Sequence, residues 1–227
     1  QRTYDQLQQD LCINNNPITI LTFAASVWGM NDVTHLGIYD IPMMSNIPNL
    51  VYLAPTTYEE YIAMLDWSTE QREHPVAIRV PGAVIHGEKP TKDYGILNKY
   101  ETVQKGSGAA IIALGTFFGM GKQAAELIEK KTGVKPTLIN PVYITGIDEE
   151  LLESLKKDHK AVVTLEDGIL DGGFGEKIAR FYGDSDMRTV NFGLKKEFLD
   201  RYDANEVLRQ NCLTPEQIAD RAAELVK

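Results

Sequence analysis

The chain of 227 residues is 43% hydrophobic and 24% charged, which is typical of a soluble globular protein with one large or two small domains. No run of about eighteen apolar residues occurs, so a membrane-spanning protein is not expected. The formal net charge is −9, and acidic residues outnumber basic ones over residues 1–106 (12 against 7) and 107–227 (20 against 16). This balance argues against nucleic acid and favours a small-molecule substrate or a protein partner.

The first part of the chain has the alternating pattern of a parallel α/β sheet. Short apolar runs predict buried strands. Between the second and third of these strands, apolar residues recur at helical spacing, which predicts a helix that crosses one face of the sheet. That helix has a threonine cap and an acidic first turn. The expected elements are a helix over 3–13, strands over 18–23 and 50–54, a helix over 56–71 and a strand over 75–80.

The connection over residues 24–49 is too long for a plain turn. Its many apolar side chains predict a packed loop with a polar tip. His35 lies in that tip, where an imidazole can hydrogen-bond a polar substrate or move a proton near neutral pH. Asn31, Asp32 and Thr34 could orient it. The alternative is a surface histidine bonded to backbone, since a lone histidine is a weak signal.

Residues 83–108 interrupt the pattern with proline, glycine and charged residues, and we place the domain junction there, with one strand pair at 94–98 and 100–105. The α/β pattern then restarts and predicts a compact parallel domain of about four or five strands. Gly133 as a helix stop, Asp148 as a helix start and a capping box at 214–217 mark its helices. The expected elements are strands over 109–115, 136–140, 161–166 and 188–193, and helices over 120–131, 148–158, 174–182 and from 215 onward.

Two glycine-rich turns lie at strand-to-helix junctions, where ligands of open α/β sheets tend to bind. They are "GTFFGMG" at 115–121 and "DGGFGEKIAR" at 171–180. Such turns can offer backbone amides to a phosphate, but the second lacks the residues of a P-loop, and Glu166 and Asp167 beside it would repel phosphate. We therefore favour close packing of helix against sheet as the role of the glycines.

The remaining candidate ligands predict no metal site. His74, His86 and His159 lie in charged stretches and are expected to be exposed. Cys12 and Cys212 are too far apart in the sequence for a metal motif, and a disulfide framework is not expected. Free cysteines fit a reducing, cytoplasmic compartment.

Several motifs together resemble a known family. The stretches "QRTYDQLQQDL", "THLGIYDIPMMSNIPNLVYLAPTTYEEYIAML" and "PVAIRVPG" are similar to the pyrimidine-binding domain of the transketolase family, and most of all to its 1-deoxy-D-xylulose-5-phosphate synthase branch. The stretches "LGTF", "LINPVYITGIDEELLESL", "AVVTLEDGILDGGFGEKI" and "VNFGL" are similar to the C-terminal domain of that family. The resemblance covers essentially the whole chain, and its C-terminal motifs are shared with pyruvate dehydrogenase β subunits.

The resemblance implies an α/β fold with part of a pyrimidine-binding domain over 1–82, a linker over 83–108 and a transketolase C-terminal-type three-layer domain over 109–227. It implies a homodimeric enzyme that uses thiamine diphosphate and Mg²⁺ to condense pyruvate with glyceraldehyde 3-phosphate, releasing CO₂. The activating glutamate and the domain that binds diphosphate and magnesium are expected upstream of Gln1. We therefore expect the isolated chain to be inactive.

The resemblance also assigns roles to individual residues. His35 matches the family histidine that lines the substrate channel, and it is the expected catalytic residue. Asn31, Thr34 and Arg79 are the expected substrate-binding residues. Arg2 matches an arginine in the helix just after the residues that pack on the aminopyrimidine, and it is the expected cofactor-binding residue.

Three positions depart from the family pattern. Asn31 stands where the family has an aspartate, and a carboxamide cannot act as a base. Ala24 and Gly82 stand where the synthases have arginines that bind the acceptor phosphate. Of the arginines in these motifs, this sequence retains Arg79. These departures leave two alternatives open. One is another transketolase-type or 2-oxoacid dehydrogenase β-type enzyme with a different acceptor, and the other is a non-catalytic dimerisation module.

Overall fold

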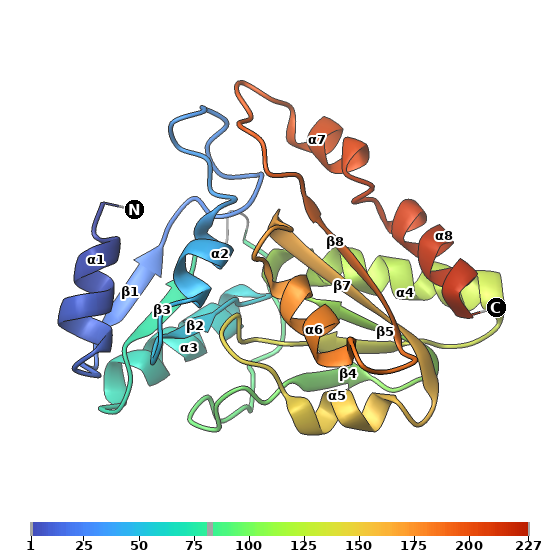
Figure 1. The fold of residues 1–227 in the computed structure, drawn as a ribbon, viewed down its shortest axis with the longest axis horizontal. Helices are drawn as coiled ribbons and strands as arrows, with labels where there is room; N and C mark the ends of the chain where they lie inside the picture. The colour runs from blue at the N-terminus through green and yellow to red at the C-terminus, as the bar shows by residue number, and fades with distance from the viewer. Residues whose placement is uncertain (1, 81–83, 227) are drawn as a thin grey trace.

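The computed structural model describes residues 2–80 and 84–226, which form two α/β lobes (Figure 1). The smaller lobe contains a three-stranded sheet and the larger one a five-stranded sheet. Gly82 lies outside the described residues. Within the described part of the chain, no helix is both long enough and apolar enough to cross a membrane.

The smaller sheet has the order β1-β3-β2, and both pairs are parallel. The predicted strands at 50–54 and 75–80 are confirmed as buried, but β1 is half-buried rather than fully buried because it lies at the edge of this sheet. The elements are β1 (Thr19–Thr22), β2 (Val51–Leu53), β3 (Val76–Arg79), α1 (Tyr4–Gln6), a π-helix (Leu7–Cys12), α2 (Asp40–Ser45) and α3 (Tyr58–Glu70).

The helices of this lobe follow local signals. The Thr57 hydroxyl accepts a hydrogen bond from the Glu60 amide (3.1 Å) and so begins α3 as predicted. The helix expected over 3–13 is confirmed, although its second half is a π-helix. Helix α2, inside the long connection, was not predicted, because its six residues are too few to show a helical period.

The larger sheet has the order β4-β6-β5-β7-β8, with β4 antiparallel to β6 and the other neighbours parallel. The restart of the α/β pattern is thus confirmed. One strand of the predicted pair is observed as β4, whereas the prediction of a strand over 94–98 is wrong, since turns occupy this segment. The strands are β4 (Glu101–Gln104), β5 (Gly108–Ala113), β6 (Thr137–Asn140), β7 (His159–Ile169) and β8 (Arg188–Leu194).

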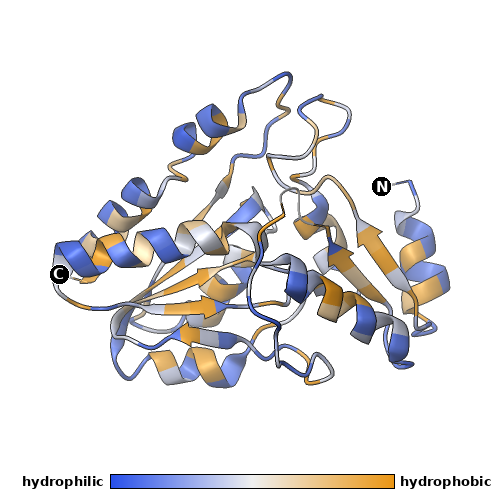
Figure 2. Cartoon of the chain, turned by 180° about the vertical axis from the view of Figure 1, so that it is seen from behind, coloured by the Kyte–Doolittle hydropathy of each residue, from blue (hydrophilic) through white to orange (hydrophobic). Residues whose placement is uncertain are grey.

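Helices cover both faces of the larger sheet and complete three layers (Figure 1). Apolar side chains of α4, α7 and α8 share one core with one face of β5 and β7, and those of α5 and α6 share a second core with the other face. Figure 2 shows the strands mostly in hydrophobic colours and the helices with mixed surfaces. The helices are a short 3₁₀ turn (Gly115–Phe117), α4 (Phe118–Thr132), α5 (Glu149–Leu155), α6 (Phe174–Tyr182), α7 (Ala204–Gln210) and α8 (Pro215–Val226).

Cap residues again set the ends of these helices. Gly133 ends α4 with φ of +73°, a left-handed conformation that favours glycine, and Asp148 accepts from the Leu151 amide (3.1 Å) to begin α5. The expectation that His159 is exposed is wrong. Its imidazole is buried, with Nε2 2.8 Å from the Thr137 hydroxyl and Nδ1 2.6 Å from the Asp158 carboxylate.

Candidate active site

The connection between β1 and α2, residues 24–39, is called the His35 loop here. Its base is closed by the Ser26 amide, which donates to the Gly37 carbonyl (2.8 Å). Gly37 and Gly29 are required there, since an added Cβ would lie 1.8 Å and 2.2 Å from the Ala24 carbonyl oxygen. Ala24 itself has φ of +56°. The loop is therefore a tightly folded element, as the apolar content of its sequence predicted.

His35 stands at the loop tip with two of the predicted neighbours. Its Nδ1 lies 2.7 Å from the Thr34 hydroxyl and 3.9 Å from the Asp32 carboxylate, and its side chain is 61% exposed. The Thr34 hydroxyl donates to Asp32, and the Thr34 amide donates to the same carboxylate (2.9 Å). The side-chain and backbone hydrogen bonds from Thr34 lower the pKa of Asp32 below its ordinary value.

This hydrogen-bond chain selects one tautomer of neutral His35. A hydroxyl has one proton, and that of Thr34 is donated to Asp32, so Thr34 accepts from Nδ1–H. Nε2 then carries the free lone pair and faces away from the chain of bonds. The tip therefore presents a proton acceptor in fixed tautomeric form.

Asn31 is part of the loop tip, but its polar groups contact the larger lobe. Its carboxamide donates to the Tyr202 carbonyl (3.4 Å), and its own carbonyl accepts from the Arg201 amide (2.7 Å). The predicted substrate-binding roles of Asn31 and Thr34 stay predictions, with Thr34 adjacent to the imidazole and Asn31 facing the other lobe.

A cavity of about 310 Å³ lies beside the loop, between α1, β1 and α2. Leu36 and Gly37, which follow His35, form part of its wall. Its described walls are mainly apolar and contain no lysine or arginine, so the cavity suits an apolar group better than a diphosphate. The lining residues are Thr3, Tyr4, Leu7, Ile20, Leu21, Thr22, Phe23, Ala25, Leu36, Gly37, Asp40, Met43 and Met44.

Arg2 precedes Thr3, the first residue that lines this cavity, and its side chain is exposed. Its cofactor-binding role stays a prediction.

Arg79, predicted to bind substrate, is buried at the junction of the two lobes. Its Nε donates to Asp40 (2.7 Å), its Nη2 donates to the other Asp40 oxygen (3.0 Å), and its Nη1 donates to Asp167. Tyr52 donates its hydroxyl to Asp40, and the Thr116 hydroxyl donates to Asp167 (2.7 Å). These five residues are called the Arg79 network, and they join β3, α2 and β2 to the larger lobe.

The charges and the hydroxyl of the Arg79 network stabilise one another. Burial alone would lower the pKa of Arg79, but the carboxylates of Asp167 and Asp40 raise it well above its ordinary value. Burial, together with the charge of Asp40, raises the pKa of Tyr52, which therefore stays protonated as a donor. Because its donors already face these carboxylates, Arg79 contributes here to joining the lobes. Its substrate-binding role stays a prediction that this geometry does not favour.

The glycine-rich turn before α6 has the structural role that the sequence favoured. A Cβ on Gly173 would lie 2.5 Å from the Glu166 carboxylate, and one on Gly175 would lie 2.5 Å from the Thr164 hydroxyl. The carboxylate of Glu166 accepts from the amides of Phe174 and Gly175 (both 2.8 Å). The amides at the start of α6 are thus occupied by the protein's own carboxyl group.

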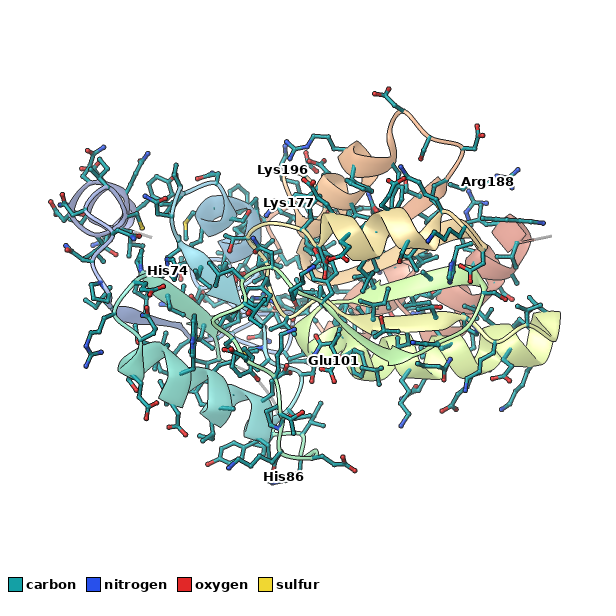
Figure 3. All side chains as sticks on the ribbon, turned by 90° about the horizontal axis from the view of Figure 1, so that it is seen from below. His74, His86, Glu101, Lys177, Arg188 and Lys196 are labelled. Carbon is teal, nitrogen blue, oxygen red and sulfur yellow. The ribbon has the colours of Figure 1, made fainter. Side chains whose placement is uncertain are left out.

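The other histidines of the smaller lobe lie away from the cavity. His86 is exposed and pairs with Glu59 (2.8 Å), and the His74 imidazole lies 3.7 Å from Glu73. Figure 3 shows His74 and His86 at separate edges of the lobe, apart from Lys177 and Lys196. They form no common site with His35.

Four members of the Arg79 network were not predicted as site residues. Asp40 lies within "THLGIYD", and Asp167 follows a buried strand and precedes a glycine turn. A carboxylate placed directly beside an apolar run was the one available signal, because it needs a buried partner. The partner could not be identified, since Arg79 is distant from both in the sequence.

Comparisons with known proteins agree with this architecture. The family model of the transketolase pyrimidine-binding domain matches residues 1–84, and that of the transketolase C-terminal domain matches residues 98–218. The predicted boundaries at 82 and 109 stay predictions.

Curated relatives cover the chain from end to end. It is 34% identical over 232 residues to a 1-deoxy-D-xylulose-5-phosphate synthase of Clostridium perfringens (strain SM101 / Type A), and 32% identical over 229 residues to that of Clostridium tetani (strain Massachusetts / E88). Both alignments take in 100% of this chain and 37% of the relative. The chain thus spans little more than a third of the length of these enzymes.

Solved structures show the same fold. A "split gene transketolase, inactive beta4 tetramer" superposes with a TM-score of 0.83 at 21% identity, covering 100% of this chain and 73% of that one. A transketolase of Pichia stipitis in complex with sedoheptulose 7-phosphate gives 0.71 at 19% identity, covering 95% and 31%. The two matched domains and the shared fold together show that this chain belongs to the transketolase family.

Proposed function

We propose that this chain is the part of a thiamine diphosphate-dependent transferase that contains half of its pyrimidine-binding domain and its C-terminal domain. The reaction is condensation of pyruvate with glyceraldehyde 3-phosphate to 1-deoxy-D-xylulose 5-phosphate and CO₂, a step toward isoprenoids and thiamine. The observation that supports it most is the similarity of the whole chain to synthases of that name, at 34% identity.

Thiamine diphosphate, when bound, supplies the nucleophilic carbon and the electron sink that decarboxylation of pyruvate requires. In this proposal the apolar cavity between α1, β1 and α2 receives its aromatic part, and Arg2 precedes the first lining residue, Thr3. The diphosphate and Mg²⁺ would be held by a further domain, in the same polypeptide or on a separate subunit, because no basic residue lines this cavity. We also propose that the complete enzyme is a cytoplasmic homodimer.

In this proposal, His35 is the residue that transfers protons to and from the substrate. The hydrogen-bond chain to Thr34 and Asp32 keeps its proton on Nδ1 and leaves Nε2 free to accept a proton from a substrate hydroxyl or to bind its oxygen. Asp32 thereby orients His35. Asn31, which stands where the family has an aspartate, has a neutral carboxamide and could not orient the imidazole by charge.

A different acceptor is the second candidate. Ala24 is half-buried in the His35 loop and has no charge with which to bind a phosphate, and Arg79 already donates to two carboxylates. A smaller or uncharged aldehyde, or another ketose donor, would not need those contacts. A non-catalytic dimerisation module is a third candidate, and complete loss of turnover in the assay below would favour it.

The test is CO₂ release from pyruvate by the complete enzyme with thiamine diphosphate and Mg²⁺. Where the diphosphate-binding domain is a separate subunit, the two are mixed. Release that depends on glyceraldehyde 3-phosphate and gives a five-carbon product supports the synthase. Release without that dependence indicates another acceptor, and no release contradicts both enzymatic proposals.

A further inference from the structure

The segment that follows β8, residues 195–203, lies against the His35 loop at one end of the molecule (Figure 1). We infer that this segment, called the clasp, determines the position of the loop tip, and that Tyr202 is a positioning residue for His35. The catalytic half of this inference rests on the proposed function, whereas the structural half does not.

Tyr202 makes the central contact. Its hydroxyl lies 3.0 Å from the Val27 carbonyl and 3.3 Å from the Met30 carbonyl, so that one O–H donor is shared between two carbonyls of the loop. Val27 is buried in the core of the larger lobe, and Met30 belongs to the exposed tip. The hydroxyl thus connects the anchored part of the loop to its tip.

Three further hydrogen bonds join the clasp to the loop. The Arg201 amide donates to the Asn31 carbonyl (2.7 Å), with Arg201 at φ of +47°, a conformation that L residues rarely adopt. The Val33 amide donates to the Asp200 carboxylate (3.3 Å). At the loop's end, the Tyr39 hydroxyl donates to the Glu197 carbonyl (2.6 Å).

The tip has few bonds of its own. Over residues 27–35, all of which the structure describes, the backbone-to-backbone hydrogen bonds inside the loop are two short turns, from Gly29 to the Ser26 carbonyl (3.3 Å) and from His35 to the Asp32 carbonyl (2.9 Å). The clasp adds the hydrogen bonds of Tyr202, Arg201 and Asp200 to this segment, and Trp28 packs edge-on against Phe117 at its start. A segment with few internal bonds opens readily when its external contacts are lost.

His35 depends on the tip for its own position. Its polar contacts are with Thr34 and Asp32, which belong to the same tip, and its side chain is largely exposed. A shift of the tip therefore moves the imidazole and its two partners together, relative to the cavity.

The structural test is Tyr202→Phe, which removes the hydroxyl and keeps the ring, followed by amide hydrogen exchange. We expect exchange over 27–35 to become about tenfold faster, while α4 and β5 keep their rates. Tyr58→Phe is the matched control, because Tyr58 is half-exposed on α3 and its hydroxyl makes no hydrogen bond to the described residues 2–80 and 84–226. Unchanged exchange over 27–35 in Tyr202→Phe overturns the inference.

The catalytic test is a double-mutant cycle in the complete enzyme. We expect Tyr202→Phe to lower kcat about ten- to a hundredfold, with the KM for thiamine diphosphate unchanged. In a His35→Ala background the same change should cost little more, because the two residues act as a unit. An equal loss in both backgrounds overturns the positioning role. If the unaltered enzyme shows no turnover, the proposed function fails, and the exchange experiment still decides the role of the clasp.

Discussion

Replacing Arg79 by methionine tests the Arg79 network directly. Arg79 is 4% exposed and donates to Asp40 at 2.7 Å and 3.0 Å and to Asp167. Arg79→Met keeps much of the apolar stem but leaves both carboxylates buried without their cation. Removing one partner of a buried ion pair costs about 3–5 kcal/mol. Since a domain is stabilised by about 5–15 kcal/mol in total, the variant should lose a large fraction of its stability.

The assay is urea unfolding of the 227-residue chain, followed by circular dichroism. With a slope of about 1–3 kcal/mol per molar urea, the midpoint should fall by at least about 1 M. Arg221→Met is the matched control. Its side chain is about half exposed and pairs with Glu224 at 2.9 Å, so the cost should be below about 1 kcal/mol. If Arg79→Met also lowers the free energy of unfolding by no more than about 1 kcal/mol, the structural role is refuted. The predicted substrate-binding role of Arg79 would then be the better interpretation.

Three further predictions concern Glu166, His35 and the cofactor. Burial raises the pKa of Glu166 from 4.5 to about 8, so folded Glu166 keeps a proton that the unfolded chain loses. Its contribution to stability should therefore decline between pH 4.5 and about pH 8, and a urea midpoint series should show a shallower slope in Glu166→Gln, with the remainder from buried Glu60, whose pKa burial also raises. A slope unchanged by the substitution contradicts the assignment. His35→Asn should lower kcat for CO₂ release by about 10²–10⁴ in the complete enzyme, and a loss below about threefold would exclude proton transfer by this residue. Titration calorimetry of the isolated chain with thiamine diphosphate and Mg²⁺ should show no micromolar binding, and such binding would contradict the need for a further domain.

Much of the fold was predictable because local signals and burial agree. The central strands β5 and β7 contain apolar runs at 109–113 and 161–163, as expected for strands covered on both faces, and Gly133, Asp148 and Thr214 mark helix ends by their own chemistry. Helix α7 was not predicted, because its seven residues follow a loop and show little period. His159 was misjudged for a related reason. Its sequence neighbours are charged, but burial of the start of a strand depends on partners such as Thr137 from another strand.

The candidate site was less predictable because its contacts join distant parts of the chain. The sequence placed Asp32, Thr34 and His35 together, since they are neighbours, but the Arg79 network joins residues 40, 79 and 167. Arg79 also shows why a matching residue type does not establish a role. A guanidinium that could hold a phosphate holds two carboxylates equally well, and only the fold shows which of the two is present.

The length of the His35 loop follows from the two lobes that it joins. Val27, Leu36 and Ile38 pack in the core that α4, α7 and α8 form with the larger sheet, although the loop begins and ends in the smaller lobe. The Ile169 amide donates to the Ile38 carbonyl (3.0 Å), which holds the last part of the loop against the end of β7. A short connection could not reach that core and return to α2. The loop is long because it is anchored in one lobe while Leu36 and Gly37, which follow His35, line the cavity of the other, so a change in the packing of the two lobes should also move His35.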